Sequence, residues 1–145
     1  LRASMAWIGQ RPHIFAGTIA GNVALGRPGI LRDDVTDALD AARLGKVAAA
    51  YGNRPLGEGG IGLSGGEALR LAIARAACNP HLRIILADEP TAHLDAATAA
   101  EVTESLLLLA RGRTLIVATH DPLLADRMHR AMRIDADIVM REAAE

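Results

Sequence analysis

The stretches LSGGE, at residues 63–67, and IILADEPTAHLD, at residues 84–95, decide the fold of this chain. In the first stretch, a serine and two glycines precede residues 67–77, whose apolar side chains recur at the spacing of a helix. Glycine has no Cβ, so its backbone can approach an anion closely. The first N–H groups of a helix lack helical partners and favour phosphate. This stretch therefore predicts a phosphate contact at a helix N-terminus.

The second stretch begins with a short apolar run at residues 84–87, which is typical of a buried strand in a parallel sheet. The run ends at Asp88 and Glu89, and open α/β sheets bind ligands at the carboxyl ends of their strands. One carboxylate could hold Mg²⁺ while the other polarises a water that attacks phosphorus. Each pattern alone is usually an ordinary turn or loop, but the ordered set indicates a phosphate-cleaving site.

Length and composition favour one ordered domain and argue against several other classes of protein. The 145 residues suffice for one modest domain, and a hydrophobic content of 50% argues against disorder. The net charge of −1, with no strongly basic run, argues against a dedicated nucleic-acid binder. The single cysteine, Cys78, is interpreted as a small core residue. No apolar run reaches the roughly 18 residues that span a bilayer.

Two further strands are expected. The first covers residues 5–10 and ends at Gln10; the second covers residues 114–118 and delivers His120 to the same sheet edge as Asp88 and Glu89. Helices are expected after the acidic pair at residues 33–34, at residues 96–110 and at residues 122–130, and a final hairpin at residues 131–134 and 137–140.

Together these motifs resemble the nucleotide-binding domain of ABC-type ATPases. LSGGE resembles the signature motif, residues 84–89 the Walker B strand with its catalytic glutamate, and residues 92–95 the D-loop. Gln10 resembles the glutamine of the Q-loop, and His120 the switch histidine. The resemblance covers essentially the whole chain, but only the latter part of such a domain.

The resemblance implies an α/β fold: the C-terminal part of a P-loop NTPase-like core, with a mostly parallel sheet and an inserted helical subdomain. It divides the chain into a Q-loop region at residues 1–20, the helical subdomain with the signature at residues 21–80, and the remaining core at residues 81–145. The cofactors implied are ATP and Mg²⁺. The partners implied are a second nucleotide-binding domain and the coupling helices of a membrane domain, with no nucleic acid.

The resemblance also assigns roles to individual residues. The signature would contact the γ-phosphate bound by the partner domain, whereas the Walker B, Q-loop and switch residues act on ATP in their own domain, and the D-loop aspartate links the two sites. The signature residues are Ser64, Gly65, Gly66 and Glu67. The residues that would hold Mg²⁺ are Asp88 and Gln10, those that would act in catalysis are Glu89, His120 and Gln10, and the D-loop residue is Asp95.

One motif of the family has no match here. A P-loop needs the pattern G-x-x-x-x-G-K-[ST], and the only lysine, Lys46, lies outside such a pattern. We therefore expect the chain to be a piece of a longer protein and to be inactive as an ATPase by itself. Two departures from the commonest family wording are Glu67, where glutamine is usual, and the D-loop sequence AHLD. Glu67 is expected to place a negative charge near a bound polyphosphate.

The wording of residues 14–26 resembles exporters, and that of residues 56–66 and 87–95 the bacterial thiol-reductant exporters, with CydD the closer subunit. Those two-subunit exporters of cysteine and glutathione serve cytochrome bd assembly. This implies a site at the cytoplasmic face of the bacterial inner membrane, with Glu58 as a candidate contact to the membrane domain. Two alternatives stay open: a soluble ABC ATPase of DNA repair or translation, and a non-enzymatic remnant.

Overall fold

The computed structural model describes residues 4–134, apart from the side chain of Glu58, and is built on a three-stranded parallel sheet. The strands are β1 (Met5–Ile8), β2 (Ile84–Asp88) and β3 (Thr114–Ala118), in that spatial order. All three expected strands are present, although β1 ends at Ile8, before Gln10. Ile8 pairs with Ala87, so the carboxyl ends of β1 and β2 lie at one edge of the sheet.

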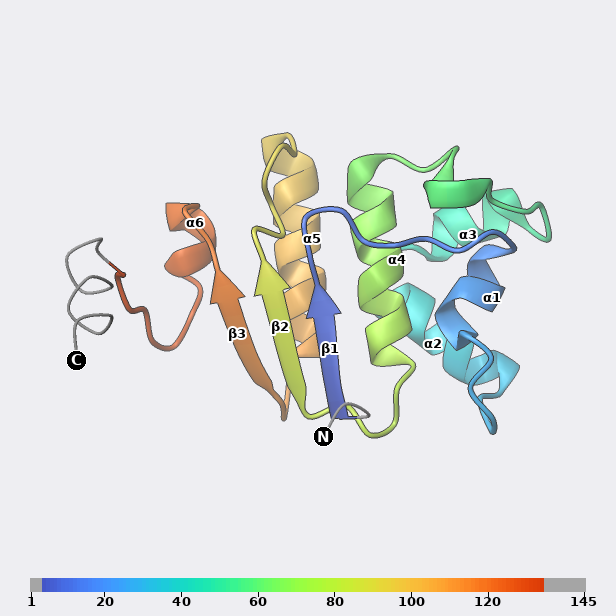
Figure 1. The fold of residues 1–145 in the computed structure, drawn as a ribbon, viewed down its shortest axis with the longest axis horizontal. Helices are drawn as coiled ribbons and strands as arrows, with labels where there is room; N and C mark the ends of the chain where they lie inside the picture. The colour runs from blue at the N-terminus through green and yellow to red at the C-terminus, as the bar shows by residue number, and fades with distance from the viewer. Residues whose placement is uncertain (1–3, 135–145) are drawn as a thin grey trace, which may run out of the picture.

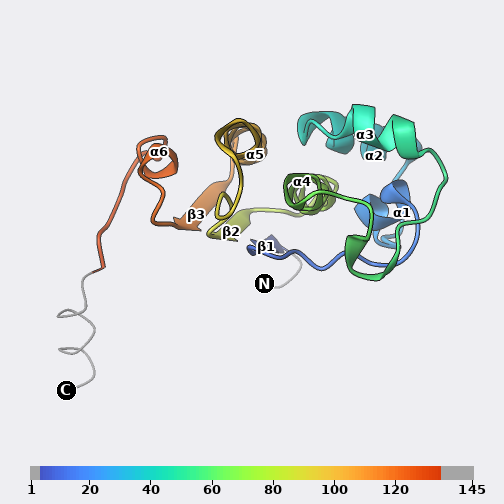
Figure 2. The same cartoon turned by 90° about the horizontal axis from the view of Figure 1, so that it is seen from above.

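In the described residues the sheet is accompanied by six α-helices and one short 3₁₀ helix (Figure 1). They are α1 (Ile19–Ala24), α2 (Arg32–Ala41), α3 (Gly45–Tyr51), η2 (Glu58–Gly60), α4 (Gly65–Ala77), α5 (Ala96–Leu109) and α6 (Pro122–Ala125). Helix α4 packs against α5, α1 and α2. Figure 2 shows α4 and α5 on one side of the sheet, with α1, α2 and α3 grouped beyond α4. This confirms the α/β fold with a parallel sheet.

Helix α4 is central because its apolar side chains cover most of its circumference. Leu71 and Ile73 are each buried, with exposures of 0% and 1%. A helix with apolar residues on several faces needs partners on several sides. Helices α1, α2 and α5 and the sheet supply those partners, and Cys78, just beyond α4, is buried as expected for a small core residue.

The face of the sheet opposite α4 and α5 has no helix of the described residues against it (Figure 2). Trp7, Leu86 and Ile116 are register partners across the three strands and point to that face. Trp7 is 65% exposed and Ile116 is 56% exposed. Parallel sheets usually have both faces covered, so this row of side chains is a surface that further polypeptide can bury.

Several expected elements differ from the structure. Helix α6 ends at Ala125 instead of Arg130, because Arg127 and Met128 donate to carbonyls three residues earlier and close tighter turns. Residues 131–134 are not in a strand, and the second arm of the expected hairpin lies outside the described residues. Helix α2 begins at Arg32, and Asp34 accepts the Leu31 N–H at 2.7 Å, so Leu31 is the cap residue.

Candidate functional site

The carboxyl ends of the three strands gather the candidate catalytic residues. Asp88 is the last residue of β2, pairs with Ala118 of β3 and is exposed. Glu89 follows Asp88, and His120 lies two residues beyond β3. The topology that places these strands side by side therefore brings residues separated by about thirty positions in sequence to one edge, as the spacing predicted.

Glu89 holds the loop after β3 through both carboxylate oxygens. Its Oε1 accepts the backbone N–H of His120 at 3.1 Å and lies 2.8 Å from His120 Nδ1. Its Oε2 accepts the Thr119 hydroxyl at 3.3 Å. Glu89 has a φ of 45°, and its N–H donates to Ala118 O at 2.9 Å. A non-glycine residue in the left-handed region is uncommon and is held there by its surroundings.

The imidazole of His120 is exposed, yet it is paired with a carboxylate. The hydrogen bond to Glu89, followed by the charges of Glu89 and Asp121, raises the pKa of His120 above its ordinary value. Burial acts in the opposite direction on the pKa but is outweighed. His120 therefore keeps its proton to higher pH, and the protonated ring is a suitable donor to a phosphate oxygen.

A second contact connects the loops that follow β2 and β3. The Thr91 hydroxyl donates to Asp121 Oδ2 at 3.0 Å, while Asp121 Oδ1 accepts the Leu123 N–H at 3.0 Å and caps α6. These loops, with Glu89 and His120, line a hollow of about 290 Å³. The hollow is of the size expected for part of a small-molecule site.

The donor chemistry at this edge fits Mg²⁺ together with a polyphosphate. Magnesium is usually held by one or two carboxylates plus substrate phosphates, rather than by a cage made only of protein groups. Asp88 offers one exposed carboxylate at the strand end, and the exposed Gln10 follows β1 at the same edge. No group of three or more potential metal ligands occurs among the described residues.

The LSGGE stretch forms the N-terminus of α4. Ser64 is the N-cap: its hydroxyl accepts the Glu67 N–H at 3.3 Å, and its own N–H donates to Glu67 Oε2 at 2.7 Å. This reciprocal arrangement is a capping box. The Glu67 carboxylate is thus turned back onto the backbone, which qualifies the expectation that Glu67 simply adds charge near a polyphosphate. Ser64-x-x-Glu67 was the sequence signal for it, because serine followed by glutamate three residues later marks helix starts.

Asp95 of the D-loop stretch also caps a helix. Its carboxylate accepts the Thr98 N–H at 3.0 Å and the Thr98 hydroxyl at 2.6 Å, at the start of α5. These hydrogen bonds from Thr98 lower the pKa of Asp95. A Cβ added to Gly66 would collide with the Thr98 methyl group, so the starts of α4 and α5 pack closely because Gly66 has no side chain.

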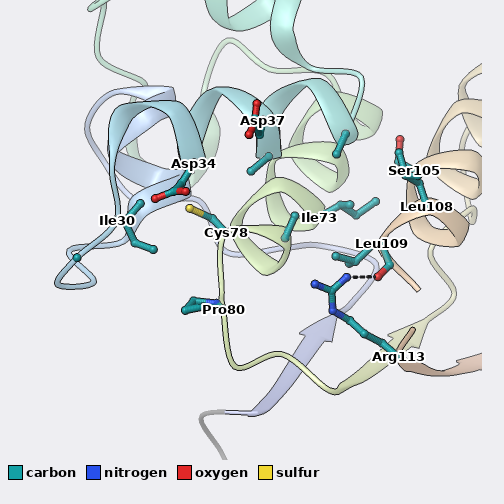
Figure 3. Close-up of a pocket in the computed structure, with 14 residues that line it drawn as sticks. Ile30, Asp34, Asp37, Ile73, Cys78, Pro80, Ser105, Leu108, Leu109 and Arg113 are labelled. Atoms are coloured by element: carbon teal, nitrogen blue, oxygen red, sulfur yellow. Dashed lines mark hydrogen bonds between the residues drawn. The ribbon is translucent and has the colours of Figure 1, made fainter. Parts of the chain in front are cut away.

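A second hollow, larger than the one at Glu89 and His120, lies elsewhere (Figure 3). It has a volume of about 430 Å³ and lies between α2, α4 and α5, with Asp34, Cys78 and Arg113 on its wall. Arg113 and Pro80 precede β3 and β2, so this cavity is toward the amino ends of the strands. Burial raises the pKa of the Cys78 thiol, which favours its unreactive protonated form.

The family model described as "ABC transporter" matches residues 1–92. The chain is 40% identical over 121 residues to the Escherichia coli (strain K12) glutathione/L-cysteine transport system ATP-binding/permease protein CydC, covering 83% of this chain and 21% of that protein. It is 35% identical over 146 residues to the mycobactin import ATP-binding/permease protein IrtB of Mycolicibacterium thermoresistibile, covering 99% of this chain and 25% of that protein.

Among solved structures, a bacterial Atm1-family ABC exporter with ATP bound matches with a TM-score of 0.74 and 34% identity, covering 86% of this chain and 22% of that one. The chain thus spans about a fifth to a quarter of the length of these relatives. The Escherichia coli relative is named CydC, whereas the residues quoted from the sequence favoured a resemblance to CydD. Within residues 4–134, no helix has both the length and the apolarity needed to cross a membrane.

Proposed function

Because this chain belongs to the ABC transporter family, whose model matches residues 1–92, we propose that it is the part of an ABC exporter that hydrolyses ATP to drive transport. The observation that carries this proposal is the carboxyl edge of the sheet. There, Glu89 and His120 lie 2.8 Å apart beside the exposed carboxylate of Asp88. Phosphoryl transfer to water needs a general base, a group that donates a hydrogen bond to the phosphate, and a metal ligand.

In the proposed reaction, water attacks the γ-phosphorus of ATP, a new P–O bond forms, and the bond to the bridging oxygen breaks to release ADP and phosphate. Glu89 orients the water and accepts its proton. Oε1 of Glu89 already receives two contacts from His120, so Oε2, with its longer bond to Thr119, has more capacity to accept from water. His120 donates to the γ-phosphate, and Gln10 contacts the metal and the water.

Bound Mg²⁺ would neutralise phosphate charge, and Asp88 is the residue placed to hold it. The γ-phosphate would also be contacted by Ser64, Gly65 and Gly66 of a second nucleotide-binding domain. The capping box supports this assignment: it satisfies the Ser64 N–H through Glu67, while the following glycines keep the backbone accessible. Asp95 would link the two sites from the D-loop, where it fixes the start of α5.

We propose that most contacts to the β- and γ-phosphates come from polypeptide outside these 145 residues, because the sequence has no P-loop pattern. The uncovered sheet face around Trp7 and Ile116 supports this, since it offers an apolar surface for the rest of the core. In the same scheme residues 1–20 are the Q-loop region, residues 21–80 the helical subdomain with the signature, and residues 81–145 the part of the core with the Walker B strand, the D-loop and the switch histidine.

The proposed partners are a second nucleotide-binding domain and the coupling helices of a membrane domain, which places the chain on the cytoplasmic face of a bacterial inner membrane. We propose cysteine or glutathione as the exported substrate, in support of cytochrome bd assembly, on the strength of the likeness to CydC. CydC and IrtB are both named as transport proteins, which favours this proposal over a soluble ATPase of DNA repair or translation.

The test uses the full-length protein that contains this chain, reconstituted in lipid, and measures phosphate release from MgATP. We expect the unmodified protein to hydrolyse ATP and Ser64→Arg to reduce the rate by about tenfold or more, since the arginine occupies the space of a phosphate oxygen. Ala49→Arg, at an exposed position on α3, serves as the control and should retain the rate. A protein without ATP hydrolysis would contradict the proposed function, and full activity in Ser64→Arg would contradict the signature role.

A further inference from the structure

The last turn of α4 carries an arginine that the proposed reaction does not use. The guanidinium of Arg75 donates to His13 O at 2.8 Å, to Asn22 O at 3.0 Å and to Asn22 Oδ1 at 2.8 Å. It also lies over the Phe15 ring, 5.1 Å from the centroid. Burial lowers the pKa of Arg75, and the charge of Arg27 contributes in the same direction. An arginine held in this way forms a three-point connection that a lysine cannot reproduce.

The side chain of Asn22, which accepts from Arg75, also bonds to the backbone of the preceding residues Phe15 and Thr18. It is 3% exposed, its Oδ1 accepts the Phe15 N–H at 2.9 Å, and its Nδ2 donates to Phe15 O at 2.9 Å and to Thr18 O at 3.1 Å. Residues 13–18 therefore form a loop that is closed onto the first turn of α1, because backbone groups of Phe15 and Thr18 bond to the single amide of Asn22. The loop presents Phe15 to solvent with 44% of its surface exposed.

The same loop is also joined to the segment that precedes LSGGE. Gly17 and Leu56 exchange backbone hydrogen bonds, of 3.4 Å from the Gly17 N–H and 2.8 Å from the Leu56 N–H. Ile14 packs against Gly60 so closely that a Cβ there would lie 3.0 Å from the Ile14 side chain. Residues 13–22 are thus connected to α4 at its C-terminal end through Arg75, and to the approach to Ser64 through the Gly17–Leu56 bridge.

We propose that Arg75 is a positioning residue that locks residues 13–22 to helix α4, so that Gln10, just upstream, and Ser64, at the far end of α4, keep a fixed relative position. This inference rests on the proposed function, because it deepens the roles given there to Gln10 and Ser64. The rigid part is α4 itself: its thirteen residues keep their helical hydrogen bonds, and its apolar face is buried. The proposed role of Arg75 is carried by its contacts with His13, Asn22 and Phe15.

The first experiment measures backbone amide exchange in the full-length protein, comparing Arg75→Lys with Arg32→Lys, an exposed arginine at the start of α2. Lysine keeps the charge, but its single ammonium group cannot reach all three acceptors of Arg75, which are His13 O, Asn22 O and Asn22 Oδ1. We expect the amides of residues 13–18 to exchange about tenfold faster in Arg75→Lys, while the interior of α4 is unchanged. Unchanged exchange at residues 13–18 would overturn the proposal.

The second experiment separates positioning from a merely structural role by measuring kcat and KM for MgATP. We expect Arg75→Lys to lower kcat about tenfold with little change in KM, because misplacing Gln10 affects the transition state more than ATP binding. An unchanged kcat in a variant whose loop exchanges faster would overturn the positioning role.

A third variant keeps the experiment decisive if Arg75→Lys folds poorly. Asn22→Asp retains acceptors for Arg75 but removes the amide donors to Phe15 O and Thr18 O, so we expect faster exchange within residues 15–18 together with a lower kcat than in the unmodified protein. An unchanged kcat in an Asn22→Asp protein whose residues 15–18 exchange faster would overturn the positioning role of this segment. If the unmodified protein hydrolyses no ATP, the proposed function fails, whereas the exchange experiment still tests the connection itself.

Discussion

Glu67 and Glu89 both lie beside expected phosphate contacts, but the structure gives their carboxylates different partners. Glu67 accepts from the Ser64 backbone and stabilises the start of α4, whereas Glu89 joins β2 to the loop that carries His120. A glutamate beside a site for polyanions is therefore not by itself a catalytic group, and its hydrogen-bond partner separates the two cases.

Substitutions at Glu67 separate helix capping from charge. We predict that Glu67→Ala lowers the free energy of unfolding by about 1 kcal/mol, because the Ser64 N–H loses its acceptor. Glu67→Gln keeps an acceptor oxygen and should stay within a few tenths of a kcal/mol of the original. Urea unfolding monitored by circular dichroism measures both. Equal losses in the two variants would show that charge, rather than capping, is what Glu67 contributes.

The His120–Glu89 pair predicts a pH dependence. Because the pKa of His120 is raised in the folded chain, the stabilisation from this pair is fully present below the ordinary value of 6.5 and is lost as pH rises through the higher folded value. An NMR titration of the imidazole should show a midpoint above 6.5, which falls when Glu89 is replaced by Gln. A midpoint that is unchanged by this substitution would exclude Glu89 as the cause of the raised pKa of His120.

At the scale of elements, the starts of α4 and α5 limit each other because Gly66 faces Thr98. In an ordinary helix, glycine to alanine is stabilising by roughly 0.5–1 kcal/mol. We predict the opposite sign for Gly66→Ala, a loss of about 1–3 kcal/mol, because the new methyl meets the Thr98 methyl. Chemical denaturation measures the difference.

The matched variant for this contact is Thr98→Ser, which removes the methyl but keeps the hydroxyl that bonds Asp95. The double variant Gly66→Ala with Thr98→Ser should recover most of the loss, giving a clear interaction energy in a double-mutant cycle. If the two substitutions were simply additive, the close approach of α4 and α5 would not be the cause.

The elements also show where a sequence is informative. The apolar runs at β2 and β3 and the spacing in α4 and α5 predicted those elements because burial and period coincide there. The short helices α1 and α3 were not predicted as separate helices, since six or seven residues carry too few apolar repeats. Of the candidate site, the sheet edge was predictable, whereas contacts between side chains far apart in sequence, such as Arg75 with Asn22 and Thr91 with Asp121, leave no local pattern.

At the scale of the whole molecule, the uncovered sheet face makes a prediction about the 145-residue chain. Its single tryptophan, Trp7, is 65% exposed on that face. We predict that acrylamide quenches its fluorescence efficiently at low protein concentration, and that quenching weakens as concentration rises and chains associate through the face. Strong protection at every concentration would contradict a freely exposed face.

The most direct test of the central claim is nucleotide trapping by Glu89→Gln in the full-length protein. Glutamine keeps the size and an acceptor oxygen but cannot take a proton, so we expect ATP hydrolysis to fall by about 10²-fold or more while ATP still binds and accumulates on the protein without being cleaved. Asp37→Asn, at an exposed carboxylate on α2, should leave hydrolysis unchanged. Undiminished turnover in Glu89→Gln would contradict the assignment of Glu89 as the residue that activates water.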